Sequence, residues 1–301
     1  MLILLGALLA VGAAAGAGAK LRPNGRIVWV SDQDFSGQEI PKGVALEIYS
    51  MVATGGDVRR LTHDRHNDEY PAASPNGRKI AFVDESLHSG TRWSHIVVMN
   101  ANGTGAHNIS GVHGGDTQPS WSPDGRRIAF SNQGVWVMNA NGTGRRQIVT
   151  PKGNPVWTSS PVSWSPDGKA ITFQGTDPDS VQGTDGTWSI GVDGTGARLL
   201  AAGVRQPRLS PDGRKLVGVD RSGMVIVIVD LRSGARRRLT SHVIATSPAW
   251  SPDGRKIVYA SSYFQTRTPY GEITTMNADG SDKRRLTNNS RDDIEPVWAA
   301  R

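Results

Sequence analysis

A tetrapeptide that recurs along the chain constrains the fold of this protein more than any other feature. Ser-Pro-Asp-Gly, or in its first copy Ser-Pro-Asn-Gly, begins at residues 74, 122, 165, 210 and 251, at intervals of 48, 43, 45 and 41 residues. Repeats of about 40–50 residues are typical of the four-stranded blades of β-propellers. The sequence therefore predicts a ring of repeated sheets rather than one continuous core.

Each repeat unit contains a regular series of strand and turn patterns. Alternating runs such as RKIAFVD and RRIAFSN follow the tetrapeptide, and a third segment such as IVVMNANG ends in Asn-Gly or Asp-Gly. Such pairs favour tight hairpin turns because both residues tolerate positive φ. A short basic segment such as VRRLT or KRRLT completes the unit. We predict an all-β fold with four antiparallel strands per blade.

The two ends of the repeat predict a sixth blade. Five complete units begin at the tetrapeptides, whereas the segment after Pro23 supplies three strands without a first one. Pro296-Val-Trp298 matches Pro248-Ala-Trp250, so we expect the C-terminal strand to join the N-terminal blade and close the ring. The repeated Trp of the first strand is expected to pack between blades; it is found at Trp121, Trp164, Trp250 and Trp298.

Composition and the first residues indicate an exported protein. The chain has 301 residues and no Cys, which excludes disulfides, thiolate metal sites, a cysteine nucleophile and a lipidated cysteine anchor. Residues 1–19 are uncharged and apolar, with small residues at two possible cleavage sites. We predict a signal peptide over 1–19, with an uncleaved anchor as the alternative, and a propeller over 20–301. The expected location is periplasmic, cell-envelope or secreted.

The repeat resembles that of a known family. The pattern P-x-W-S-P-D-G-R-K-I-A-F, followed by V-M-N-A-N-G-T and R-R-L-T, is similar to the TolB-type six-bladed propeller over essentially all of residues 20–301. The resemblance implies protein–protein contact and a role in envelope integrity or transport. TolB proper carries an α/β domain ahead of its propeller, and we expect the propeller alone here.

The strand order predicts which face of the ring carries a binding site. Connections between second and third strands, and from blade to blade, share one face and include the long variable segments Ser31–Ala45, Asp84–Trp93, Gln174–Thr187 and Ser261–Gly271. Binding residues favour variable loops on a rigid scaffold. Three Asp residues stand three positions before a Pro in this region and are expected to flank the channel mouth: Asp68, Asp116 and Asp293.

These Asp residues have two interpretations. They could bind a cation such as calcium or attract a basic peptide. Alternatively, they cap loop backbone N–H groups, which is the commoner use of Asp in turns. The full set of predicted binding residues is Asp68, Glu69, Tyr70, Asp116, Arg205, Asp293, Trp93, Tyr263, Phe264 and Tyr270.

No metal site is predicted from the histidines. His63, His66, His113 and His242 fall in the loops between blades. A metal site demands several converging ligands, and solvated surface histidines are the simpler interpretation. Apart from a calcium ion at the channel mouth, we expect no cofactor.

Sequence motifs favour a binding protein over an enzyme. The chain contains no G-x-S-x-G, H-E-x-x-H or P-loop motif. The net charge of +7 comes mostly from cations at repeated positions around the ring, so nucleic-acid binding is not expected. We predict a monomeric, non-catalytic scaffold for a protein or peptide partner, without membrane insertion beyond an N-terminal anchor. The alternative is a lyase- or hydrolase-type enzyme, or a carbohydrate-binding protein, that uses the same channel mouth.

Overall fold

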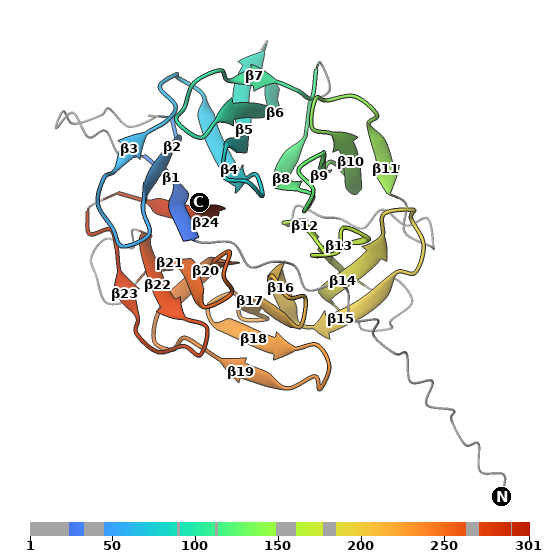
Figure 1. The fold of residues 1–301 in the computed structure, drawn as a ribbon, viewed down its shortest axis with the longest axis vertical. Helices are drawn as coiled ribbons and strands as arrows, with labels where there is room; N and C mark the ends of the chain where they lie inside the picture. Colours follow the sequence, from blue (N-terminus) through green and yellow to red (C-terminus); the bar gives the residue numbers. More distant parts are fainter. Residues whose placement is uncertain are drawn as a thin grey trace, which may run out of the picture.

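The protein is a ring of six antiparallel sheets around a common axis (Figure 1). The computed structural model describes residues 24–32, 45–88, 91–111, 114–148, 161–176, 185–262, 271–289 and 291–301. Each sheet has four strands in these ranges, which confirms the all-β six-bladed prediction. No helix in the described ranges is long and apolar enough to cross a membrane. The predicted signal peptide, residues 1–19, lies outside the described residues.

We number the blades from the one that contains both the first and the last strand, β1 and β24. Blade 1 consists of β24 (Asp293–Ala300), β1 (Asn24–Ser31), β2 (Glu47–Val52) and β3 (Arg59–Arg60). Blade 2 consists of β4 (Asn67–Ala73), β5 (Lys79–His88), β6 (Thr91–Asn100) and β7 (His107–Asn108). Blade 3 consists of β8 (Thr117–Trp121), β9 (Arg127–Ser131), β10 (Val135–Asn139) and β11 (Arg146–Ile148).

The remaining blades follow in chain order. Blade 4 consists of β12 (Ser163–Trp164), β13 (Ala170–Thr176), β14 (Asp185–Gly191) and β15 (Arg198–Ala202). Blade 5 consists of β16 (Val204–Leu209), β17 (Lys215–Asp220), β18 (Ile226–Asp230) and β19 (Arg236–Arg238). Blade 6 consists of β20 (Ile244–Trp250), β21 (Lys256–Ser262), β22 (Glu272–Asn277) and β23 (Arg284–Arg285).

The ring closes as the sequence predicts. The C-terminal strand β24 pairs antiparallel with β1, with Val28 opposite Val297 and Ile27 opposite Trp298. β24 is therefore the innermost strand of blade 1, and the C-terminus lies near the axis in Figure 1. Closure of this kind removes the open sheet edge that would otherwise remain on β1.

The core is divided into six apolar layers, one between each pair of neighbouring blades. The repeated Trp residues lie in four of these layers and are at most 9% exposed. The indole N–H groups of three of them also donate to a carbonyl of the preceding blade, at 3.0–3.1 Å: Trp121 to Ala72, Trp164 to Ser120 and Trp250 to Arg208. The blade-packing role predicted for these residues is confirmed.

The tetrapeptide forms the tight turn between the first and second strands. In blade 3, the Ser122 hydroxyl donates to Oδ1 of Asp124 at 2.5 Å and accepts from the amide of Arg127 at 2.9 Å. Gly125 adopts a φ of 70°, which favours glycine. Equivalent contacts occur in the other tetrapeptides. The repeated Ser is thus a turn residue.

One segment predicted as a long loop is a β-hairpin instead. The sequence interpretation placed Asp84–Trp93 in a variable loop, but β5 runs to His88 and β6 begins at Thr91. The register continues from Asp84 opposite His95 to His88 opposite Thr91. Polar residues hid this extension, because a strand that projects beyond the blades needs no apolar alternation.

Candidate functional site

The innermost strands carry a repeated backbone irregularity at the residue before their Pro. The pairing register shifts at this point in β4, β8, β16 and β20. The residue before Pro has a φ of 50–54° in five blades, at Tyr70, Gln118, Gln206, Ser247 and Glu295. Positive φ is uncommon outside glycine, and a residue before Pro normally favours extended backbone. Strained backbone of this kind often marks a functional site.

The bulges aim side chains toward the axis of the ring. In a regular strand, side chains point to the two sheet faces, which in a propeller face the neighbouring blades. A bulge re-aims a side chain, and here it brings residues from successive blades together around one cavity of about 300 Å³. The cavity is lined by Tyr70, Pro71, Gln118, Pro119, Pro161, Gln174, Gln206, Arg208, Ser247, Pro248, Ala249, Glu295, Pro296 and Val297.

Side chains of the bulged positions link neighbouring blades around the cavity. The carboxylate of Glu295 in blade 1 accepts from the amide of Tyr70 in blade 2 at 2.7 Å. The side-chain carbonyl of Gln206 in blade 5 accepts from the amide of Ser247 in blade 6 at 2.8 Å. These two contacts are equivalent in the repeat. They hold the cavity wall in one arrangement before any ligand enters.

Two ionisable groups on the cavity wall have shifted pKa values. Burial, together with the charge of Glu69, raises the pKa of Glu295 to about 8, while the bond from the Tyr70 amide and the charge of Arg208 oppose this shift. Burial lowers the pKa of Arg208 to about 10, and the charge of Glu295 opposes this shift. At neutral pH Glu295 is therefore mostly protonated, whereas Arg208 keeps its charge. The cavity then presents a guanidinium to an entering ligand.

We expect Glu295→Gln to change how stability depends on pH. An acid with a raised pKa in the folded state stabilises the fold fully below its unfolded pKa, and this contribution is lost as pH rises through the folded pKa. The stability of the parent relative to Glu295→Gln should fall between about pH 4.5 and about pH 8. The expected fall is a few kcal/mol, since one pKa unit corresponds to about 1.4 kcal/mol. Gln206 shows that an amide fits this position.

Urea unfolding at pH 5, 7 and 9 measures this difference. Asp279→Asn is a suitable control because hydrogen bonds from Ser281 lower the pKa of Asp279, so that this group does not titrate in the range tested. Parallel pH profiles of the parent and Glu295→Gln would contradict the shifted pKa of Glu295.

The Asp residues expected at the channel mouth are buried and do not line the cavity. Asp68, Asp116 and Asp293 are all 0% exposed, and none of them lines the cavity. Asp116 bonds to the side chains of Asn132 and Arg145. The physical reason for Asp68 and Asp293 is the bulge: they pair with Asp84 and Ser31 before it, in the regular part of the strand pair, where side chains face a neighbouring blade rather than the axis. Asp116 directly precedes β8.

Asp293 is held by donors of its own blade and of the preceding loop. Its Oδ1 accepts from the Trp29 indole at 3.0 Å and its Oδ2 from the Asn289 amide at 2.9 Å. Burial raises the pKa of Asp293, while hydrogen bonds from Ser31, Thr287, Asn289 and Trp29 lower it. The partners are mainly side chains, whereas one of the two sequence interpretations expected capping of loop backbone.

Asp68 differs from the other two Asp residues. Neither of its carboxylate oxygens has a hydrogen-bond partner of normal geometry among the described residues. Burial, together with the charges of Asp64, Glu47 and Asp84, raises the pKa of Asp68 to about 9, while the nearby Thr62 hydroxyl opposes this shift.

The remaining predicted binding residues are distributed over the structure. Tyr70 lines the cavity. Glu69 lies next to it on β4 and raises the pKa of Glu295. Arg205 pairs with Asp185 at 2.8 Å, and Trp93 is 37% exposed and stacks on His95. Tyr263, Phe264 and Tyr270 lie outside the described residues.

Comparisons with known proteins agree with the propeller fold. The family model described as the TolB beta propeller domain matches residues 92–301. The chain belongs to the TolB β-propeller family. TolB from Acinetobacter baumannii is 22% identical, with a TM-score of 0.73, over 92% of this chain and 67% of that one. A putative TolB from Agrobacterium tumefaciens is 18% identical, with a TM-score of 0.66, over 92% of this chain and 98% of that one.

A third similar structure is not described as a TolB protein. A chain of a nidogen/laminin complex is 14% identical, with a TM-score of 0.67, over 91% of this chain and 98% of that one. Likeness at this identity shows the fold. The family resemblance predicted from the sequence is confirmed by the TolB model and the two TolB structures.

In this TolB-type propeller, most of the cavity wall was not predicted from the sequence. The polar residues that were not predicted stand next to the repeated Pro, at Gln118, Gln206, Arg208, Ser247 and Glu295, or on the second strand of blade 4, at Gln174. A signal was present, because a Pro stands at the same place of the repeat in five of the six blades. A Pro inside a strand is expected at bulges or edges. With a bulge expected at this Pro, the predicted binding residue would have been the one directly before Pro rather than the one three positions before it.

Proposed function

We propose that this chain is an exported, non-catalytic scaffold that binds a protein or peptide partner of the cell envelope at its channel. The observation that carries this proposal is the preformed cavity on the axis, lined by polar side chains from successive blades. Preformed, mostly rigid cavities with a few placed polar groups are the usual form of a binding site. Export rests on the sequence pattern of residues 1–19.

The chemistry of the cavity favours an extended peptide segment with an acidic side chain or terminus. Gln118, Gln174 and Gln206 line the cavity, and side-chain amides are groups that hydrogen-bond well to a peptide backbone. Arg208 offers a charged donor to a carboxylate, and Glu295 does not cancel it at neutral pH because its pKa is about 8. Hydrogen bonds to charged groups are stronger than neutral ones.

Arg208→Gln tests the channel as the binding site. The variant removes the charge and keeps most of the side-chain length. We expect it to weaken partner binding roughly 10- to 100-fold, since a hydrogen bond to a charged group contributes about 1.5–3 kcal/mol. The measurement is retention of partners from a cell-envelope extract on immobilised protein, followed by the affinity of the identified partner for each variant.

The chain offers a matched control on the same strand. Arg205 lies three residues before Arg208 on β16 but pairs with Asp185 and does not line the cavity. Arg205→Gln should bind the partner like the parent. Equal loss in both variants, or loss in neither, would contradict binding in the channel. If the folded chain retains no partner from the extract, a protein or peptide ligand is contradicted, and glycans and small carboxylates become the ligands to test.

A further inference from the structure

The junction between blades 1 and 2 contains a cluster of groups suited to a metal ion. The loop from β3 to β4 supplies Asp64 and His66, and β5 supplies Asp84. One ligand atom from each of the three lies within 4.8 Å of the others. Nδ1 of His66 is 3.2 Å from Oδ1 of Asp84. The cluster is separate from the axial cavity, whose lining includes none of these residues.

A buried carboxylate stands beside this cluster without a partner. Asp68 is 0% exposed and lies directly opposite Asp84 in the β4–β5 pair. Directly opposite residues have Cβ atoms about 4.5–5.5 Å apart on one sheet face. Both oxygens of Asp68 are buried with no hydrogen-bond partner in the described part of the chain. The nearby Thr62 hydroxyl does not satisfy them, because it donates its one proton to Glu47 at 2.5 Å.

A residue of the third strand of blade 2 lies beside Asp68 and Asp84. His95 of β6 lies directly opposite Asp84, so Asp68, Asp84 and His95 form a cross-strand row on one face of blade 2. Nδ1 of His95 is buried without a hydrogen-bond partner in the residues described. Buried polar atoms without partners are rare in native proteins and call for an explanation such as an ion.

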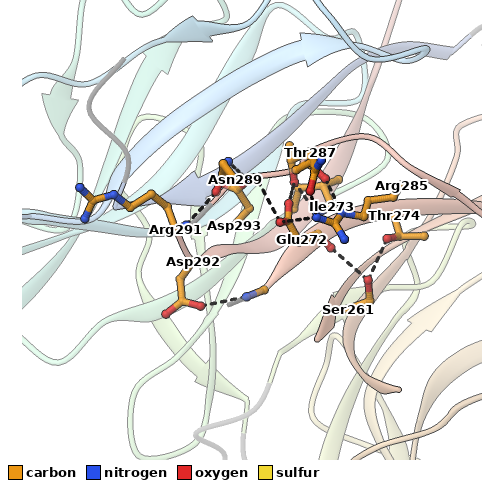
Figure 2. Close-up of polar contacts among 12 residues, drawn as sticks. Ser261, Glu272, Ile273, Thr274, Arg285, Thr287, Asn289, Arg291, Asp292 and Asp293 are labelled. Carbon is orange, nitrogen blue, oxygen red and sulfur yellow. Dashed lines mark hydrogen bonds and ion pairs between the residues drawn. The ribbon is translucent and has the colours of Figure 1, made fainter. Parts of the chain in front are cut away.

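The repeat supplies an internal comparison at the junction between blades 6 and 1 (Figure 2). There Glu272 accepts from Arg285 at 3.0 Å and from Thr287 at 2.7 Å. At the junction between blades 1 and 2, Glu47 makes the same two contacts, with Arg60 at 2.6 Å and Thr62 at 2.5 Å. The two junctions therefore share one frame, a buried Glu that accepts hydrogen bonds from an Arg and a Thr.

Within this frame, donors at one junction are replaced by carboxylates at the other. Asn289, which donates to Asp293, corresponds to Asp64. Ser31, opposite Asp293, corresponds to Asp84, opposite Asp68. The donating Trp29 corresponds to Phe82, which has no donor. The Asp68 junction has thus gained two carboxylates and lost three donors.

Asp116, the third buried Asp that precedes a repeated Pro, has a cationic partner. Asp116 accepts from Asn132 at 2.7 Å and from Arg145 at 2.8 Å. Asp68 alone among the three lacks both amide and cationic partners in the described structure. A buried carboxylate surrounded by like charges is costly unless a cation compensates it.

We propose that Asp64, His66, Asp68 and Asp84 bind a divalent transition-metal ion at the junction between blades 1 and 2. The donor set combines imidazole nitrogen with carboxylate oxygen, which suits Zn²⁺ or Mn²⁺ better than the all-oxygen preference of Ca²⁺. The ion clamps the β3–β4 loop to β5, and so joins blade 1 to blade 2. This proposal departs from the solvated role that the sequence suggested for His66, and it is independent of the channel proposal.

Metal titration of the purified, chelator-treated full chain tests the site. Calorimetry with Zn²⁺, Mn²⁺ and Ca²⁺ in separate runs should show one Zn²⁺ or Mn²⁺ per chain. The decisive variant is Asp64→Asn/Asp84→Ser, which copies the residues of the other junction and should fold because the chain already uses that set. We expect it to lose at least roughly 100-fold in affinity, and His66→Gln at least roughly 10-fold.

His63→Gln is the matched control, since it removes an exposed histidine of the same loop that is not in the cluster. It should bind metal like the parent. Absence of Zn²⁺ and Mn²⁺ binding at 100 μM, or equal binding by Asp64→Asn/Asp84→Ser, would overturn the site. Ca²⁺ binding without Zn²⁺ or Mn²⁺ binding would overturn the assigned metal class. If the double variant does not fold, the single variants His66→Gln and Asp64→Asn replace it. Unchanged metal binding in both of them would overturn the proposed site.

Discussion

Removal of residues 296–301 should abolish the cooperative unfolding of this propeller. The deletion takes away most of β24, the innermost strand of blade 1, including Trp298, which is 7% exposed in the layer between blades 6 and 1. Loss of one buried Trp side chain alone costs about 3–5 kcal/mol. The deletion also removes the pairing of Val297 and Trp298 with β1. The total loss is comparable to the whole stability of a typical domain, about 5–15 kcal/mol.

The open ring also exposes a sheet edge. β1 would keep β2 as its neighbour but lose β24 on its inner side, and unpaired edges promote aggregation. Scanning calorimetry and size-exclusion chromatography measure both effects. Deletion of Arg301 alone is the control, because Arg301 is exposed and follows the last strand. A melting transition of the longer deletion that matches the control would contradict ring closure by β24.

Asp116→Asn should destabilise the protein by about 3 kcal/mol. Asp116 is 0% exposed and forms a bidentate pair with Arg145, whose side chain is 17% exposed. The guanidinium also lies 4.7 Å from the ring centres of both Phe130 and Trp136. Breaking a buried pair typically costs 3–5 kcal/mol because the partner charge is left uncompensated. The residual exposure of Arg145 places this variant at the lower end of that range.

Urea denaturation of the parent and variant measures this loss. Asp282→Asn is the matched control, since Asp282 pairs with Lys256 and Arg284 at the surface and its side chain is 37% exposed. Exposed pairs contribute little, so the control should unfold like the parent. Equal unfolding midpoints for Asp116→Asn and Asp282→Asn would show that the Arg145 pair does not stabilise the fold.

Arg145 shows where residue type alone misled the sequence interpretation. It belongs to the basic segments of the fourth strands, whose cations the sequence places at repeated positions around the ring. In another of these segments, all three Arg residues of β19 are exposed. Arg145 instead turns inward to a buried Asp. Its partner lies 29 positions away in the chain, and no local pattern reports such a distance.

The binding residues were predictable only in part. Tyr70 was found because it is an aromatic residue without a repeat counterpart, and it does line the cavity. The three Asp residues were expected beside it, but the bulge at the residue before Pro separates their directions. A strand whose register shifts by one residue changes which side chain faces the axis. The shift depends on pairing between strands, which spacing alone does not report.

The repeat pattern specifies the architecture of this protein. A period near 45 residues, a turn tetrapeptide found five times and an Asn-Gly or Asp-Gly hairpin in most units specify blade number, strand order and ring closure, because each of these is a local pattern that recurs along the chain. The chemistry depends instead on tertiary contacts. The axial cavity and the cluster around Asp68 each combine residues from different strands, blades or loops. Whether a buried carboxylate meets an arginine, an amide or another carboxylate depends on which side chains the neighbouring strands bring beside it.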